Sequence, residues 1–318
     1  MRIAFTKCHG SGNDFPLIDA RALQLPDATW AGIARALADR TGPVGGDGLL
    51  LLTAGDEAHA FGMRMFNSDG SEAETCLNGL RCVARAGFAG LGGTRARVKL
   101  KTSSATVAID PELAPGVVTI RETAGPADPD VSHWPLAGAT VLVDARVPSL
   151  PSERLFTAIS IPNPHLISFV ALVDDAELSA LGAVCEAAPA WLPNRANVSF
   201  VEVRDGDLFV RTFERGVGLT DSCGSAMAAS TYAACLTGRV KFAAPLTVFN
   251  AGGMVRAEAR EDAMVTLSGN ATFEWEGSAE VDPMNGLAGD LVIDRWHNDE
   301  IAAWAGVIEG ITNNALLT

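Results

Sequence analysis

Two cysteines in this sequence, Cys76 and Cys223, occupy equivalent positions in two similar stretches of chain. Each follows a strand-like run and a polar turn, and each opens a segment with helical character. The unpaired backbone N–H groups and the positive dipole end at a helix N-terminus stabilise a thiolate. A cysteine so placed can act as a base. Two of them can flank one ligand, one taking a proton from a carbon and the other returning a proton to its opposite face.

The elements that must position these cysteines are readable from apolar spacing. A strand over residues 61–66 precedes Cys76, and a second strand over residues 208–213 precedes Cys223. An Ala/Ser-rich helix that ends near Gly238 follows Cys223. The helix after Cys76 is indicated by apolar residues at helical spacing and by a glycine-rich end. These are Leu77, Leu80, Ala84 and Phe88, then Gly90, Gly92 and Gly93.

A chain of 318 residues allows two domains of ordinary size, and the repeated layout favours two. We expect one lobe over residues 1–123, completed by about 271–282, and a second lobe over 124–270. Residues 124–134 are the best linker candidate. Residues 283–318 are expected to be a helical C-terminal extension, in which Asn298 is a candidate N-cap.

Short strands dominate the remaining pattern, which predicts an α+β fold. One further helix is expected in the first half, with Asp27 as its N-cap and Trp30, Ile33, Ala34 and Leu37 on its apolar face. The other strands are expected at residues 2–6, 15–19, 49–53, 97–101, 117–121, 139–145, 158–160, 166–170 and 198–203.

Composition excludes several functional classes. Hydrophobic residues make up 48% of the chain and charged residues 19%, which permits a substantial core. The formal net charge of −14 argues against sequence-independent nucleic-acid binding. The six cysteines include no Cys-x-x-Cys pair, so neither a zinc site nor a disulfide scaffold is indicated. With no apolar core in residues 1–7 and no long apolar run, we expect a cytoplasmic protein without a membrane partner.

Five stretches, in their order and spacing, resemble the motifs of the diaminopimelate epimerase family. They are HGSGNDF at 9–15, NSDGSEAETCLNGLRC at 67–82, NPH at 163–165, NVSF at 197–200 and ERGVGLTDSCGS at 214–225. The resemblance covers residues 1–282. It implies two pseudosymmetric lobes, each a mixed, mainly antiparallel sheet wrapped around a central helix, with the active site between them, and a homodimer.

The resemblance also implies a reaction: cofactor-independent epimerisation of LL-diaminopimelate to meso-diaminopimelate by two cysteine bases. Cys76 and Cys223 are then catalytic, His165 pairs with Cys76, and Glu214 pairs with Cys223. No metal is implied. Arg215 suits a carboxylate because a guanidinium can bind it through two hydrogen bonds. The substrate-binding residues implied by the motifs are Asn13, Asn67, Asn78, Gly79, Asn163, Asn197, Arg215, Gly224 and Ser225.

The sequence departs from the family pattern at a few positions. Leu77 stands where glycine is usual, Leu219 where glutamate is usual, and Gly48 where glutamine is frequent; Ala226-Met227 also differs. These departures leave room for another substrate, so a racemase of another amino acid such as histidine is the alternative within the family.

Two alternatives lie outside the family. A thiol redox protein with a Cys76–Cys223 disulfide would lack the usual Cys-x-x-Cys motif. Nucleotide binding through the glycines of 42–48 or 90–93 would lack a phosphate-binding fingerprint.

Overall fold

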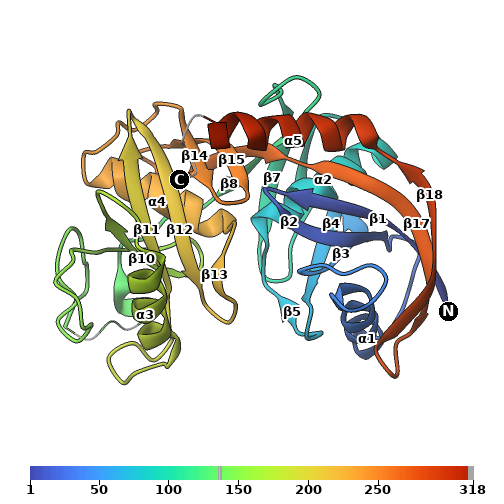
Figure 1. Ribbon diagram of the computed structural model, residues 1–318, viewed down its shortest axis with the longest axis horizontal. Helices are drawn as coiled ribbons and strands as arrows, with labels where there is room; N and C mark the ends of the chain where they lie inside the picture. Colours follow the sequence, from blue (N-terminus) through green and yellow to red (C-terminus); the bar gives the residue numbers. More distant parts are fainter. Residues whose placement is uncertain (135, 137, 314–318) are drawn as a thin grey trace. The chain divides into compact units, whose positions relative to one another are not determined.

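The computed structural model describes residues 1–134, 136 and 138–313, and the chain divides into two compact units (Figure 1). Unit 1 comprises Met1–Glu122 and Ser268–Gly310, and unit 2 comprises Thr123–Leu267 together with the described residues 311–313. The chain therefore passes from unit 1 to unit 2 after Glu122 and returns before Ser268.

Unit 1 contains most of the strands and three helices. In chain order its elements are β1 (Arg2–Gly10), β2 (Asn13–Asp19), α1 (Asp27–Ala38), β3 (Gly48–Asp56), β4 (His59–Asn67), β5 (Glu72–Ala73), α2 (Leu77–Leu91), β6 (Arg95–Lys99), β7 (Ser104–Asp110), β8 (Thr119–Ala124), β17 (Thr272–Asp282), β18 (Leu287–Trp296) and α5 (Asn298–Asn313). The sheet runs β18–β17–β1–β2–β3–β4–β6–β7, with β5 also paired to β4. Only the β2–β3 and β4–β6 pairs are parallel.

Unit 2 repeats this pattern of pairing. Its elements are η1 (Val131–His133), β9 (Thr157–Ser160), β10 (Pro164–Phe169), α3 (Asp175–Glu186), β11 (Asn197–Arg204), β12 (Asp207–Glu214), β13 (Gly218–Thr220), α4 (Gly224–Leu236), β14 (Leu246–Asn250), β15 (Gly253–Ala259) and β16 (Val265–Asn270). The sheet runs β9–β10–β11–β12–β14–β15, with β13 also on β12. Its pairs alternate antiparallel and parallel in the same succession as β1–β2–β3–β4–β6–β7. In both units the helix that follows a catalytic-candidate cysteine comes directly after the additional short strand: α2 follows β5, and α4 follows β13.

The helices of unit 1 form where the apolar spacing predicts them. In α1 the side chains of Trp30, Ile33, Ala34 and Leu37 are all buried against the sheet. Burying each of the three large ones contributes about 1.5–3 kcal/mol. The predicted N-cap was wrong by one residue, because Pro26 is the N-cap of α1. Asp27 lies in the first turn, where its negative charge interacts favourably with the positive end of the helix dipole. In α2 the predicted apolar face is buried, and the helix ends at Gly92, whose φ is 78°.

Several elements differ from the sequence expectation, and strands β7, β14, β15 and β16 were not predicted. Residues 139–145 do not form a strand, because Val141 and Ala145 make only isolated bridges. Helix α3 was not predicted; Asp174 caps it by accepting the N–H groups of Ala176 and Glu177 at 2.9 and 3.0 Å. The extension after residue 282 is not helical throughout. It contains β18, which pairs with β17, and only then α5.

The strands expected at residues 2–6 and 15–19 are longer than predicted, because β1 extends to Gly10 and β2 starts at Asn13. Only a tight turn at Ser11-Gly12 separates them. In the described part of the chain, no helix is both long and apolar enough to cross a membrane.

Candidate active site

Cys76 is the N-cap of α2, as its position in the sequence predicts. Its backbone is extended (φ −148°, ψ 107°), and its Sγ accepts the N–H of Gly79 at 3.3 Å. The thiol also donates to the amide oxygen of Asn13 at 3.7 Å. The Gly79 N–H and the helix N-terminus together stabilise negative charge on the sulfur.

Two asparagine amides lie next to this thiol. Asn78, in the first turn of α2, donates from Nδ2 to Asn13 Oδ1 at 3.5 Å. The Nδ2 group of Asn13 donates in turn to the carboxylate of Asp47. Because a carboxylate only accepts, this bond turns the Asn13 amide oxygen towards Cys76 and Asn78. Four predicted site residues of unit 1 are thus brought together: Asn13, Cys76, Asn78 and Gly79.

The remaining predicted residue of unit 1, Asn67, has local partners at the end of β4. Its Nδ2 donates to Ser71 Oγ at 2.9 Å, and its backbone closes a turn through Gly70 and Ser71. Its part in binding a ligand stays a prediction.

Cys223 is the N-cap of α4 and differs from Cys76 in its surroundings. Only 7% of its surface is exposed, and its Sγ lies 3.4 Å from Ser225 Oγ. Burial raises the pKa of the Cys223 thiol well above its usual range, and the neighbouring Glu214 carboxylate raises that pKa further. The thiol form, which can give up a proton, is therefore favoured at Cys223. Glu214 lies beside the cysteine with which the family resemblance pairs it.

His165 is fully buried on β10 between two of the predicted asparagines. Its Nε2 lies 3.2 Å from Asn163 Oδ1 and 3.5 Å from Asn197 Nδ2. Burial lowers the pKa of the imidazole to about 3, with a contribution from the charge of Arg215. His165 is thus neutral, and its Nδ1 has no hydrogen-bond partner among the described residues. Nδ1 can accept a proton in the tautomer whose Nε2–H donates to Asn163 Oδ1. The pairing of His165 with Cys76 stays a prediction.

Arg215 provides an uncompensated positive charge in unit 2. Its backbone N–H donates to Asn197 Oδ1 at 2.8 Å, and its Nη1 donates to the carbonyl of Asn194 at 3.0 Å. No carboxylate among the described residues forms an ion pair with it. A ligand carboxylate would satisfy the remaining donors of its guanidinium.

The departures from the family pattern have structural consequences. A Cβ on Gly48 would lie 2.3 Å from the carbonyl oxygen of Phe66, so a side chain there would require a shift of the β3–β4 pair. Leu77 is buried, whereas Leu219 is 38% exposed on β13.

Sequence reasoning missed two charged residues that contact the site amides, Asp47 and Arg81. Asp47 binds Asn13, and Arg81 donates from Nη2 to Asn78 Oδ1 at 2.8 Å. The signal available for Arg81 was its spacing, since residues i and i+3 of a helix lie on one face.

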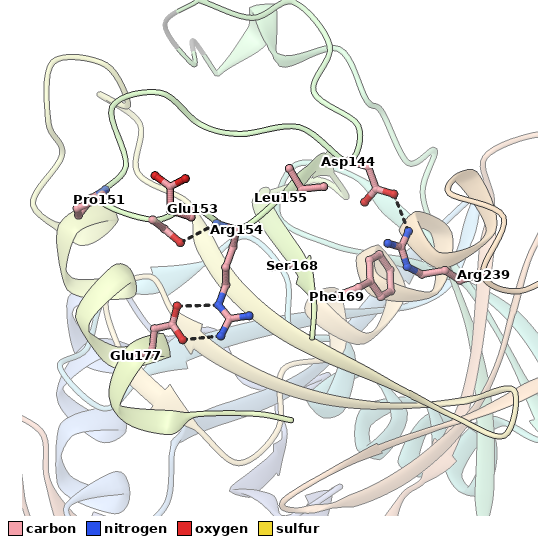
Figure 2. A pocket seen from close by; sticks show the side chains of 10 residues that line it. Asp144, Pro151, Glu153, Arg154, Leu155, Ser168, Phe169, Glu177 and Arg239 are labelled. Atoms are coloured by element: carbon pink, nitrogen blue, oxygen red, sulfur yellow. Dashed lines mark hydrogen bonds and ion pairs between the residues drawn. The ribbon is translucent and has the colours of Figure 1, made fainter. Parts of the chain in front are cut away.

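A wide depression of about 590 Å³ on unit 2 contains none of the predicted site residues (Figure 2). Its two arginines are already paired, Arg154 with Glu177 through two bonds of 2.6 Å and Arg239 with Asp144 at 2.8 Å. Among the described residues, no group of three or more His, Cys, Asp and Glu side chains is placed to hold a metal ion.

The fold matches solved structures at low sequence identity. A phenazine biosynthesis protein of the PhzF family from Bacillus anthracis aligns with a TM-score of 0.62 and 14% identity, over 88% of this chain and all of that one. A probable proline racemase from Agrobacterium radiobacter K84 aligns with a TM-score of 0.62 and 14% identity, over 97% of this chain and all of that one. The chain thus has the mixed, sheet-dominated fold that these proteins share.

Sequence comparison then gives the family. The family model for diaminopimelate epimerase matches residues 5–120 and 157–274. A diaminopimelate epimerase from Clostridium acetobutylicum is 39% identical over 290 residues, which covers 89% of this chain and 87% of the relative. The chain belongs to the diaminopimelate epimerase family, and as a member it is an isomerase.

Proposed function

We propose that the protein epimerises LL-diaminopimelate to meso-diaminopimelate without a cofactor, using Cys76 and Cys223 as its two bases. The observation that carries this proposal is the equivalence of the two cysteines. Each is an N-cap residue with an extended backbone, Cys76 at the start of α2 and Cys223 at the start of α4. Each helix follows a short strand, β5 or β13, that occupies the same place in the pairing pattern of its unit. Two such groups can remove a proton from one face of a carbon and return one to the opposite face.

The surroundings of the two thiols support a division of labour. Cys76, whose sulfur accepts an N–H bond, is suited to remove the α-proton, and Cys223, held as a thiol, is suited to supply one. The reverse reaction exchanges the roles. Glu214 next to Cys223 is suited to hold a proton that this thiol exchanges, and His165, whose Nδ1 has no hydrogen-bond partner among the described residues, would serve Cys76 in the same way.

The α-proton of an amino acid is a very weak acid, so the site must stabilise charge that develops on the reacting carboxylate. First-turn N–H groups at Asn78 of α2 and at Gly224 and Ser225 of α4 are suited to this task. Gly79 would line the same turn, with its N–H directed to Cys76 Sγ. The distal amino acid group of the substrate would bind Arg215 and the asparagines Asn13, Asn67, Asn163 and Asn197. The lack of a carboxylate partner for Arg215 within the described residues supports that assignment.

We further infer that the two units are pseudosymmetric lobes, each with its sheet wrapped around a central helix. The matching succession of strand pairs supports this inference, as does the packing of α2 and α4 on the strands of their own units. The lobes would comprise residues 1–123 with 271–282, and 124–270.

The assembly and location that we propose are a homodimer in the cytoplasm, acting in the biosynthesis of lysine and of peptidoglycan precursors. Exposed apolar side chains on the edge strand β18, among them Val292 and Trp296, support a contact with a second copy. Light scattering coupled to size exclusion measures the assembly.

Proton NMR in D2O tests the reaction. Purified protein is incubated separately with LL-diaminopimelate, L-histidine and L-lysine, with no cofactor added. We expect deuterium at one α-carbon of diaminopimelate and none in the other two. Exchange in histidine or lysine instead would retain the two-thiol chemistry and overturn the substrate. Exchange in none would contradict the proposal.

A further inference from the structure

A fully buried arginine lies behind the Cys76 side of the site and makes four hydrogen bonds. Arg81, on α2, donates from Nη1 to Glu122 Oε1 at 2.8 Å and from Nε to the carbonyl of Asn270 at 3.1 Å. Its Nη2 donates to Asn78 Oδ1 at 2.8 Å and to Ser11 Oγ at 3.2 Å. Arg81 and Glu122 each have 0% exposure, so neither can touch a substrate.

The bond to Asn78 fixes which way that amide points. A guanidinium has only donors, so the atom of Asn78 that faces Arg81 must be the oxygen. The amide nitrogen therefore faces the other way, where it donates to Asn13 Oδ1 at 3.5 Å. The same oxygen accepts the Cys76 thiol at 3.7 Å. Asn13 Oδ1 thus accepts from both Asn78 and Cys76, and two oriented amides link Arg81 to the sulfur.

The chain packs closely around this guanidinium. A Cβ on Gly269 would lie 2.6 Å from Arg81 Nε, and a Cβ on Gly10 would lie 3.0 Å from Nη2. Glu122 and Asn270 lie near the two points at which the chain passes between the units. Glycine at 10 and 269 therefore leaves room for an arginine that ties α2 to both of these segments.

We propose that Arg81, with Glu122 as its counter-ion, is a positioning residue that orients the Asn78 amide and, through it, the groups next to Cys76. This inference rests on the proposed function. Because Arg81 contacts no reacting atom, the proposal predicts that Arg81 affects the reaction only through Asn78.

A double-mutant cycle tests this dependence. Arg81→Lys keeps the charge next to Glu122, but one ammonium cannot bind Glu122, Asn270, Ser11 and Asn78 together. We expect R81K and N78A each to lower kcat/KM for diaminopimelate by about tenfold or more, and the double variant to resemble N78A. Losses that multiply in the double variant would overturn the proposal, since a merely structural arginine would act independently of Asn78.

The matched control is Arg85→Lys, one turn further along α2. Arg85 also pairs with a glutamate, Glu300, at 2.5 and 2.7 Å, but it contacts none of the site amides. R85K should lower the thermal stability and leave kcat/KM within about twofold of wild type. Equal effects of R81K and R85K on kcat/KM would also overturn the proposal.

A second readout does not depend on the substrate. The pH profile for alkylation of Cys76 by iodoacetamide, read by peptide mass spectrometry, should shift in R81K and not in R85K. A shift in R81K, together with wild-type protein that does not exchange diaminopimelate protons, would retain the positioning role and overturn the proposed function. An unshifted profile would overturn the positioning role whatever the substrate.

Discussion

Substituting Gly79 by alanine should weaken the Cys76 thiolate as well as the fold. A Cβ at this position would lie 2.6 Å from Leu50 Cδ2 and 3.5 Å from Cys76 Sγ. Leu50 is fully buried, so the first turn of α2 must move away. That movement lengthens the bond from the Gly79 N–H to Sγ, which is 3.3 Å in the native protein.

The magnitude follows from the charge on the sulfur. A hydrogen bond to a charged group contributes about 1.5–3 kcal/mol, so its loss lowers the thiolate fraction by roughly 10- to 150-fold. A more basic thiolate is also a better nucleophile, and this higher reactivity offsets about half of the loss in alkylation rate on a logarithmic scale. The rate of Cys76 alkylation at neutral pH should therefore fall about three- to tenfold.

Gly87→Ala is the matched control for this experiment. A Cβ there would lie 2.6 Å from a ring carbon of the buried Phe61, which is as close a contact as the one at Gly79. Gly87 lies ten residues after the first residue of the same helix, away from Cys76. Both variants should lose about 1–3 kcal/mol of stability from overpacking. Only G79A should slow alkylation of Cys76, read by peptide mass spectrometry. Wild-type alkylation of G79A would refute the role assigned to the Gly79 N–H.

Three further predictions concern other parts of the chain. Arg215→Leu should raise the KM for diaminopimelate by roughly 10- to 100-fold while the melting temperature changes little, because the backbone carbonyl of Asn194 is the only hydrogen-bond partner of the Arg215 guanidinium among the described residues; steady-state kinetics measure this, and an unchanged KM would point to a different substrate. His165 has a pKa of about 3 when folded, below its ordinary value of 6.5, so it contributes stability that is complete above pH 6.5 and is lost as the pH falls towards 3. Wild type should lose about 2 kcal/mol more than His165→Gln between pH 7 and pH 5 in urea unfolding, and parallel losses would contradict this. Glu300→Ala should cost about 1–3 kcal/mol, because it leaves the half-buried Arg85 without its counter-ion; unchanged urea unfolding would show that α5 is held by other contacts.

The helix that carries Cys76 was predictable because three local signals agree. Its apolar residues recur with helical spacing, a cysteine precedes them at the N-cap, and glycines end them. The predicted strand at 139–145 lacked that agreement. Its central residues, Val141, Leu142 and Val143, are apolar as in a buried strand, but only isolated bridges form. A strand is stabilised by a continuous partner that local sequence does not reveal.

Helix α3 shows the opposite failure. Its capping residue Asp174 and its buried Leu178 and Leu181 were present in the sequence, but the apolar face is short. The charged partners of the site were missed for a different reason. Asp47 and Arg81 read as ordinary solvated charges, and only the contacts of distant segments with them give them a role.

The most direct test of the two-base account follows the isotope in both epimers at early times. LL-diaminopimelate is incubated in D2O, and the α-positions of the product and of the unreacted substrate are read by proton NMR before a tenth has turned over. Two separate bases predict product that carries deuterium at the inverted carbon and recovered substrate that keeps its protium. Product that retains protium, or substrate that gains deuterium as fast as product forms, would show that one group moves the proton on both faces and would contradict the account.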